Sequence, residues 1–363
     1  MKIVIQIARF IVGGLFIFSG LIKLNDPMGT AIKLKEYFEV FALDIAPFFE
    51  HFVPAAMFLA VFLSALEVVL GVAVLVVSRM RLTSIILVVL ILFFTGLTFY
   101  SAYFEKVTDC GCFGDAIPLT PWQSFYKDII LVVLIGVIFF NVSKYKEFLS
   151  MKVQNVIMGI TTLGSIAIAL LAIWYLPFID FRSYAVGNDI GALMQPEELA
   201  RYEYVMEKGG KEFRLTEYPK AGEGYTFKEA VVMNLDKSEA KIPDFNVWND
   251  DGEATEEILA GEKLIVVIHN VEKVTLKNLE QINQMATNAG VETWLLTSSS
   301  YEAFDTFRHE NQLAFPFYFA DETVLKAVVR SNPGILLFKE GVVKGKWHFN
   351  SVPSSTAVRK LLK

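Results

Sequence analysis

Long apolar runs divide the first half of the chain into segments of membrane-spanning length. Residues 3–22 are apolar apart from a few positions such as Arg9, and a spanning helix needs about 20 apolar residues. Further runs follow at residues 52–78, 82–104, 121–142 and 153–179. The pattern predicts five transmembrane helices, with an amphipathic interfacial segment at residues 23–51.

The first run could instead be a cleaved signal peptide, because it combines a basic start with an apolar centre. Such peptides end at a cleavage site made of small residues. The sequence that follows is Lys23-Leu24-Asn25-Asp26-Pro27, which offers no such site. We therefore expect the first helix to be retained.

The second half has the alternating pattern of a soluble α/β domain. Residues 264–268 form a β-branched apolar run typical of a buried strand. The pattern then predicts a helix, a strand, a helix, a strand–turn–strand unit and a last helix, at residues 273–289, 292–297, 301–311, 335–347 and 354–363. Residues 181–240 are polar and irregular, with short strands expected near residues 212–215 and 229–233.

Composition and charge narrow the classes of protein to which the chain can belong. Of its 363 residues, 54% are hydrophobic, and they are concentrated in the first half, so a lipid bilayer is the expected partner. The net charge of -6 comes without a basic block, which argues against nucleic acid. The 2 cysteines exclude both a disulfide-dense scaffold and a four-cysteine zinc site.

Basic residues in the short loops predict the orientation in the membrane. Arg79 and Arg81 lie between the second and third runs, and three lysines lie between the fourth and fifth. Because such loops are usually cytoplasmic, we expect a cytoplasmic N-terminus in a bacterial plasma (inner) membrane. The loop after residue 104 and the whole chain after residue 179 would then be extracytoplasmic, where disulfides form and persist.

Both cysteines of the chain lie in the loop after the third run, which reads Asp109-Cys110-Gly111-Cys112-Phe113-Gly114-Asp115. Cys110 and Cys112 could exchange disulfides, clip the loop passively or remain free thiols. A metal would need further ligands from elsewhere, and no metal is expected. A bridge across one glycine would be strained and readily reduced, which favours redox exchange. The two flanking aspartates would disfavour the thiolate form.

Glu67 is the ionisable residue in the second apolar run. Such groups are costly within a membrane and usually face the interior of a helix bundle. Glu67 could move protons that accompany redox chemistry. It could instead be a structural partner of Arg9 or Lys23, or a neutral acid bonded to another helix. These interpretations remain open, and we include Glu67 with Cys110 and Cys112 as the candidate catalytic residues.

The C-terminal region resembles the thioredoxin family. Residues 329–341, Val-Arg-Ser-Asn-Pro-Gly-Ile-Leu-Leu-Phe-Lys-Glu-Gly, look like the thioredoxin segment in which a cis-proline precedes a strand; Pro333 would be that proline. Ile242-Pro243-Asp244-Phe245 resembles the opening of membrane-tethered thioredoxins. The redox motif Cys-x-x-Cys, however, is replaced by His269-Asn270-Val271-Glu272. Thiol chemistry by this domain is therefore excluded, and His269 is either a loop residue or a remnant of a binding cleft.

The membrane half resembles the DoxX family and the related MauE-type methylamine-utilisation membrane proteins. The likeness rests on residues 13–20 (Gly-Gly-Leu-Phe-Ile-Phe-Ser-Gly), Lys23, Glu67, residues 109–114 and, further on, Trp122 and Lys127-Asp128. It implies a four-helix bundle and a role in extracytoplasmic disulfide handling, with a quinone as a potential cofactor. This chain has one cysteine pair, so another molecule must supply or remove the electrons.

Together these patterns predict a helical membrane bundle, made of four helices plus a fifth tethering helix, followed by an α/β thioredoxin-like domain. The expected boundaries are residues 1–145 for the bundle, 146–180 for the fifth helix, 181–240 for a connecting region and 241–363 for the thioredoxin-like domain. The expected function is accessory thiol–disulfide chemistry with an extracytoplasmic protein thiol as partner. The alternative is a non-enzymatic membrane scaffold in which the Cys-Gly-Cys loop is structural.

Overall fold

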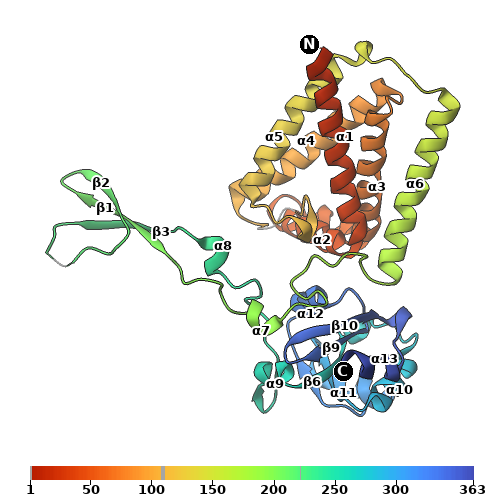
Figure 1. Cartoon of the computed structure of the whole chain (residues 1–363), viewed down its shortest axis with the longest axis vertical. Helices are drawn as coiled ribbons and strands as arrows, with labels where there is room; N and C mark the ends of the chain where they lie inside the picture. Colours follow the sequence, from red (N-terminus) through yellow and green to blue (C-terminus); the bar gives the residue numbers. More distant parts are fainter. Residues whose placement is uncertain (1, 108–110, 221) are drawn as a thin grey trace. The chain divides into compact units, whose positions relative to one another are not determined.

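The computed structural model describes residues 2–107, 111–220 and 222–363. The chain forms two compact units, Met1–Phe181 and Arg182–Lys363. The first unit is helical, whereas the second contains the strands (Figure 1).

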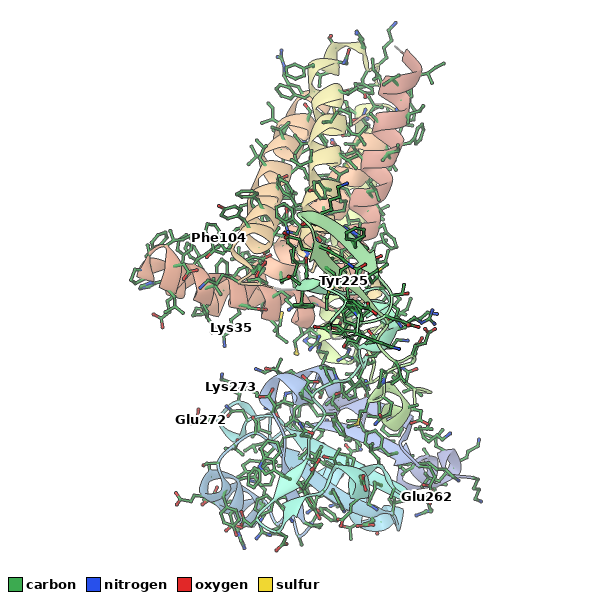
Figure 2. The ribbon with its side chains drawn as sticks, turned by 90° about the vertical axis from the view of Figure 1, so that its left-hand side faces the viewer. Lys35, Phe104, Tyr225, Glu262, Glu272 and Lys273 are labelled. Atoms are coloured by element: carbon green, nitrogen blue, oxygen red, sulfur yellow. The ribbon has the colours of Figure 1, made fainter. Side chains whose placement is uncertain are left out.

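Within the described residues, five helices of the first unit are long and apolar enough to cross a membrane, as the sequence predicts. They are α1 (Lys2–Asn25), α3 (Ala56–Leu75), α4 (Met80–Phe104), α5 (Pro121–Phe140) and α6 (Met151–Trp174). The segment predicted to be interfacial, residues 23–51, contains α2 (Pro27–Asp44) and the first part of the 3-10 helix η1 (Pro47–Ala55). All of η1 belongs to the apolar stretch Pro47–Leu75, which is long enough to cross a membrane. Helix α2 lies at one end of the bundle (Figure 1), and the view turned by 90° shows it running across that end, near the label of Lys35 (Figure 2).

Glycines bring α1 and α3 into close contact. A Cβ added at Gly20 would lie 2.7 Å from the carbonyl oxygen of Ser64, and one added at Gly71 would lie 2.7 Å from the carbonyl oxygen of Gly13. A Cβ added at Gly14 would meet nothing within 4 Å. Small residues are the usual means of close helix packing in membranes, where the hydrophobic effect does not drive association. Gly13, Gly20 and Gly71 therefore hold the α1–α3 interface.

Helix α6 packs against the bundle through small residues. Ala169 is fully buried and shares a core cluster with Leu24 of α1 and with Ala65 and Val68 of α3. Beyond α6, the side chain of Asn25 bonds both backbone groups of Ile179, at 2.7 Å to the carbonyl oxygen and 3.0 Å to the nitrogen. The chain leaving α6 thus lies beside the C-terminal end of α1.

Two further contacts mark the opposite end of the bundle. The hydroxyl of Tyr145 donates to the carbonyl oxygen of Ile5 (3.1 Å), and Arg79 donates to the side chain of Asn155 (3.1 Å). The basic loops that predict the orientation therefore lie together with the start of α1. The alternation of helix directions places residues 111–116 and the chain leaving α6 at the other end, where Ser19 contacts Cys112 and Asn25 contacts Ile179.

The second unit is built on a seven-stranded sheet with the order β10-β9-β6-β7-β8-β4-β5. Its strands are β4 (Trp248–Asn249), β5 (Gly252–Glu253), β6 (Glu262–Ile268), β7 (Glu292–Thr297), β8 (Phe317–Phe319), β9 (Gly334–Lys339) and β10 (Val342–His348). β6 pairs in parallel with β7 and antiparallel with β9, and β9 pairs antiparallel with β10. This order is that of the thioredoxin fold, and the predicted fold class is confirmed.

Helices cover the sheet because its strands are apolar on both faces. One core cluster joins alternate residues of β6, namely Leu264, Val266 and Ile268, to α10 (Leu279–Ala289), α11 (Tyr301–Glu310) and α13 (Ser355–Leu361). The intervening residues Ile265 and Val267 are equally buried and point to the opposite face. The short helices of the unit are α7 (Ile190–Leu193), α8 (Leu235–Ser238), α9 (Thr255–Leu259) and α12 (Glu322–Val328).

The helix predicted at residues 273–289 begins later than expected. The structure has a 3-10 turn, η4 (Val271–Lys273), and α10 starts only at Leu279. Asn278 adopts a left-handed conformation (φ +62°), and the backbone nitrogen of Thr275 donates to the carbonyl oxygen of Asn332 (3.1 Å). This bond to a distant loop holds residues 274–278 away from a helical path.

Between α7 and α8 lies a separate three-stranded sheet with the order β2-β1-β3. The strands are β1 (Tyr202–Lys208), β2 (Lys211–Leu215) and β3 (Thr226–Val232). Two of them coincide with the predicted short strands, and β1 was not predicted. Cross-strand ion pairs line one face, such as Arg214–Glu203 and Lys228–Glu207, both at 2.8 Å.

Candidate functional site

The Cys-Gly-Cys loop joins α4 to α5. Cys110 and Asp109 lie outside the described residues, so the site is built here from Gly111 onward. Gly111 has φ +64° and Gly114 φ +51°, and the nitrogen of Gly114 donates to the carbonyl oxygen of Gly111 (3.1 Å). Glycine is favoured at such left-handed positions because it has no Cβ. The loop therefore closes in a tight turn around Cys112.

Phe113 anchors this turn in the bundle. Its side chain is 9% exposed, and its ring packs against Phe18 of α1 with centroids 5.6 Å apart. The ammonium of Lys127 on α5 lies over the same ring, 5.0 Å from its centroid. Burial of this ring holds the neighbouring Cys112, which is half-buried, against α1 and α5.

Lys127 is the charged residue beside the Cys112 thiol. Its ammonium lies within hydrogen-bonding reach of the Cys112 side chain and 2.8 Å from Oδ1 of Asp128. Asp128 is 1% exposed and accepts a hydrogen bond from Thr98 of α4 (3.0 Å). A cation next to a cysteine favours the thiolate, which is the nucleophilic form. This electrostatic contact opposes the effect expected from the flanking aspartates.

Lys127 and Asp128 are among the residues that carry the resemblance of the membrane half to the DoxX and MauE families. In the structure, the start of α5 is fixed by a capping box between Thr120 and Gln123, which turns Asp128 into the helix bundle together with Ser124 and Leu131. A signal for this was present, because Asp128 falls on the same helical face as these residues. The contact of Lys127 with a loop cysteine had no signal in the sequence.

Glu67 lies at the centre of a second polar group. It is 2% exposed, and its Oε1 is 2.6 Å from the ammonium of Lys23 on α1. The structure thus selects Lys23 from the two cations that the sequence offered. Ser19, also on α1, lies 2.7 Å from Oε2 of Glu67 and 3.0 Å from the carbonyl oxygen of Cys112.

Glu67 is therefore joined to the Cys-Gly-Cys loop through one hydroxyl. The Lys23 ammonium also lies 5.0 Å from the centroid of the Phe94 ring, so aromatic and charged partners surround it. A buried charge pair is tolerated only when its partners are close and hydrogen-bonded. In the described residues no group of three or more His, Cys, Asp and Glu side chains is placed to hold a metal.

The thioredoxin-like domain presents a different loop at the position of the redox motif. His269 follows β6 and is 5% exposed. Its backbone nitrogen donates to Oδ1 of Asn332 (3.1 Å), whose own peptide bond to Pro333 is cis, as predicted. Burial lowers the pKa of His269 to about 4, so the imidazole is neutral at physiological pH.

The rest of that loop faces solvent. Glu272 and Lys273 are exposed and lie at the outer surface of the domain (Figure 2). The side chain of Asn332 also donates to the carbonyl oxygen of Asn270 (3.0 Å). The loop is thus fastened to the proline loop by hydrogen bonds, and it offers a neutral imidazole where a thiol would be needed.

Comparison with known proteins shows what the membrane half is similar to. Residues 1–141 match the family model described as methylamine utilisation protein MauE, which confirms the MauE resemblance of that half. A relative named Protein TlpB, from Flavobacterium psychrophilum, is 30% identical over 174 residues, which is 45% of this chain and 43% of the relative. The chain thus spans less than half the length of that relative. No solved structure matches the chain significantly.

Proposed function

We propose that this multi-pass membrane protein exchanges disulfides with an extracytoplasmic protein thiol through Cys110 and Cys112. The observation that carries the proposal is the ammonium of Lys127 within hydrogen-bonding reach of the Cys112 side chain. Thiol–disulfide exchange requires a thiolate, and a neighbouring cation stabilises that form at a membrane surface. Cys112 is accordingly the attacking residue and Cys110 the resolving one.

The proposed exchange proceeds in two balanced steps. The Cys112 thiolate attacks one sulfur of the partner's disulfide, and the second sulfur leaves as a thiolate. The Cys110 thiol then loses its proton and attacks the Cys112 sulfur of the mixed disulfide, which releases the partner's first sulfur. The partner gains two electrons and the Cys110–Cys112 pair becomes a disulfide; the reverse sequence oxidises a partner dithiol.

One cysteine pair cannot pass electrons onward by itself, so the cycle needs a second reactant. The family resemblance implies a quinone. It fits the direction in which a partner dithiol is oxidised and the Cys110–Cys112 pair becomes a dithiol, from which the quinone would take two electrons and two protons. The thioredoxin-like domain, within the proposed boundaries 241–363, would act by binding the partner. The proposed segments 1–145, 146–180 and 181–240 would supply the redox bundle, the tether and the connection.

The orientation proposed for the bacterial plasma membrane follows from charge. The loops with Arg79 and Lys144 lie at the same end as the start of α1, and such loops are usually cytoplasmic. The Cys-Gly-Cys loop and the C-terminal unit would then both be extracytoplasmic. Labelling intact cells with a membrane-impermeant maleimide tests this: Cys112 should react in whole cells after reduction, and labelling only after lysis would reverse the orientation.

Capture of partners in living cells tests the exchange itself. A Cys110→Ser variant lacks the resolving thiol, so mixed disulfides at Cys112 should accumulate and disappear on reduction. The Cys110→Ser/Cys112→Ser variant is the matched control and should capture nothing. The proposal fails if the single variant captures no protein and the double variant keeps the cellular function.

A non-enzymatic scaffold is the second candidate, and the anchoring of the loop favours it. The left-handed Gly111 and the buried Phe113 would shape the loop whether or not the cysteines react. A scaffold would tolerate loss of both cysteines and fail when the turn is disturbed, for example by Phe113→Ala. Redox exchange predicts the opposite: the loss of both cysteines should impair the cellular function more than Phe113→Ala does.

A further inference from the structure

We propose that the protonation state of Glu67 decides how tightly Ser19 holds the Cys-Gly-Cys loop. We call this hydrogen-bond switch between Glu67, Ser19 and Cys112 the latch. When Glu67 is ionised, the Ser19 hydroxyl donates to its carboxylate; when Glu67 is neutral, the hydroxyl donates to the carbonyl oxygen of Cys112. Ser19 and Glu67 are thus positioning residues for the exchange described above, and the inference rests on that proposed function for its consequence.

The latch follows from counting protons at Ser19. Its oxygen lies 2.7 Å from Oε2 of Glu67 and 3.0 Å from the carbonyl oxygen of Cys112. A hydroxyl has one proton to donate, whereas a carboxylate and a carbonyl are both acceptors. With an ionised Glu67, the two acceptors compete for that proton, and the charge-assisted bond is roughly twice as strong.

Protonation of Glu67 at Oε2 removes the competition. Its new O–H then donates to the Ser19 oxygen, and the Ser19 proton turns to the Cys112 carbonyl. All three groups are satisfied in one chain of hydrogen bonds, Glu67 to Ser19 to Cys112. The loop that holds the thiol is therefore fastened to α1 more tightly when Glu67 is neutral than when it is charged.

Lys23 is the charged group that opposes protonation. Its ammonium lies 2.6 Å from Oε1 of Glu67, on the oxygen that Ser19 does not contact. Arg9, on the same helix as Lys23, lies ten residues before Ser19, about 15 Å along the helix, with its guanidinium 4.6 Å from the centroid of the Phe10 ring. The remaining ionisable residues of elements packed on α3 have other partners, lie near helix ends or are exposed: Lys2 in the first turn of α1, Lys33 with Glu36, Lys35 with Glu39, Tyr37 with Ser101, Asp44 with Lys106 and Tyr100, the exposed Tyr103, Arg81 in the first turn of α4, Lys152 in the first turn of α6, and Glu50 and His51 in η1. The balance between Lys23 and a proton therefore sets the latch.

Close packing of α1 and α3 makes this arrangement possible. Gly20 follows Ser19 directly, and its missing side chain lets the helix approach the carbonyl oxygen of Ser64, where an added Cβ would lie 2.7 Å away. Ser19 consequently reaches both Glu67 on α3 and the loop after α4. A larger residue at position 20 would move the hydroxyl away from both acceptors.

Hydrogen exchange of the loop in the full-length protein tests the latch without any redox readout. Glu67→Gln mimics the neutral acid, because its amide can donate to the Ser19 oxygen. It should slow exchange of the Gly114 amide and its neighbours about fivefold, the effect of one added hydrogen bond. Ser19→Ala should speed exchange by a similar factor.

The decisive comparison is the double variant Ser19→Ala/Glu67→Gln. If the latch exists, Glu67→Gln has no effect on loop exchange once Ser19 is absent. An equal effect with and without Ser19 overturns the proposal.

A second variant controls for the charge of Lys23, because Glu67→Gln leaves Lys23 without a counter-charge. In Lys23→Met/Glu67→Gln the charge is balanced, and the same slowing of loop exchange is expected. Partner capture by Cys110→Ser is scored separately, so the latch and the exchange can fail independently.

Discussion

Each half of the chain has one loop at which thiol chemistry could be expected. In the membrane half it is the Cys-Gly-Cys loop after α4, and in the thioredoxin-like half it is the loop after β6. Each is a short turn fastened by a neighbouring element: Phe113 and Lys127 hold the first, and Asn332 holds the second. The first presents a thiol beside an ammonium. The second, in a domain whose fold is used elsewhere for thiol chemistry, presents a buried neutral histidine. The thioredoxin-like fold and the cysteines thus lie in different halves of the chain.

If the proposed exchange is right, the difference between the two loops shows what determines a redox site. The thioredoxin-like domain keeps its sheet order and its cis-proline, yet the residues after its central strand are His269-Asn270-Val271-Glu272. The helical bundle has neither feature, but it places a cation against a cysteine. Local electrostatics at one side chain, rather than the surrounding fold, favours the reactive thiolate.

The largest expected effect is on thiol exchange itself. Cys112→Ser should abolish exchange of the purified full-length protein with a disulfide-containing test peptide, because the attacking sulfur is lost. His269→Gln should leave the rate unchanged. A loss of exchange in the His269 variant would show that the two loops act together, and it would contradict the assignment of thiol exchange to the Cys-Gly-Cys loop alone.

Helix packing in the membrane half gives the next largest effect. Gly20→Ala introduces a Cβ close to the Ser64 backbone and should destabilise the bundle by about 2 kcal/mol, as overpacking commonly does. Gly14→Ala is the matched control, since its added Cβ meets open space. Thermal unfolding in detergent measures both, and equal midpoints would contradict the close α1–α3 contact.

The thioredoxin-like half should weaken as the pH falls. Burial lowers the pKa of His269 to about 4, whereas an unfolded histidine titrates near 6.5. The unfolded state therefore binds the proton first, so the stabilising contribution is complete above about pH 6.5 and is lost toward pH 4. Between pH 7 and pH 5 the loss should be about 2 kcal/mol.

Hydrogen exchange of the β6 and β9 amides in the full chain, corrected for intrinsic rates, measures this loss. His269→Gln should remove it. The matched control is His309→Gln, because His309 is exposed and its replacement should change nothing. Burial also lowers the pKa of His348 to about 4. His348 should therefore contribute a second part of the loss of stability, which remains in His269→Gln. An unchanged pH dependence in His269→Gln would contradict the account.

The smallest predicted effect concerns Lys127. In a Cys110→Ser background, Lys127→Met should slow alkylation of Cys112 at pH 7 about tenfold, the result of removing one nearby opposite charge. Lys127→Arg keeps the charge and should stay close to the parent rate. If the methionine and arginine variants alkylate equally fast, the ammonium does not activate the thiol.

The patterns of the sequence predicted the five spanning helices and the thioredoxin-like sheet, because apolar runs of fixed length and buried strands leave direct signals. The cis Asn332–Pro333 bond was predicted from a family motif. The start of α10 at Leu279 was not, since it depends on the bond between Thr275 and the distant Asn332. The strand β1 was missed although Gly209-Gly210, between β1 and β2, is a hairpin signal. The partners of Cys112 were also beyond reach: Lys127 and Ser19 are far from it in sequence, and nothing in their own segments points to a cysteine.

The most direct test of the central claim is a redox titration of the purified full-length protein. The protein is equilibrated in glutathione buffers of graded ratio, acid-quenched and labelled with a maleimide that adds mass to each free thiol. We predict one two-electron transition, in which zero or two labels are added, and no transition in the Cys110→Ser/Cys112→Ser variant. A constant count of labels across the whole range, whether two or zero, would contradict the account.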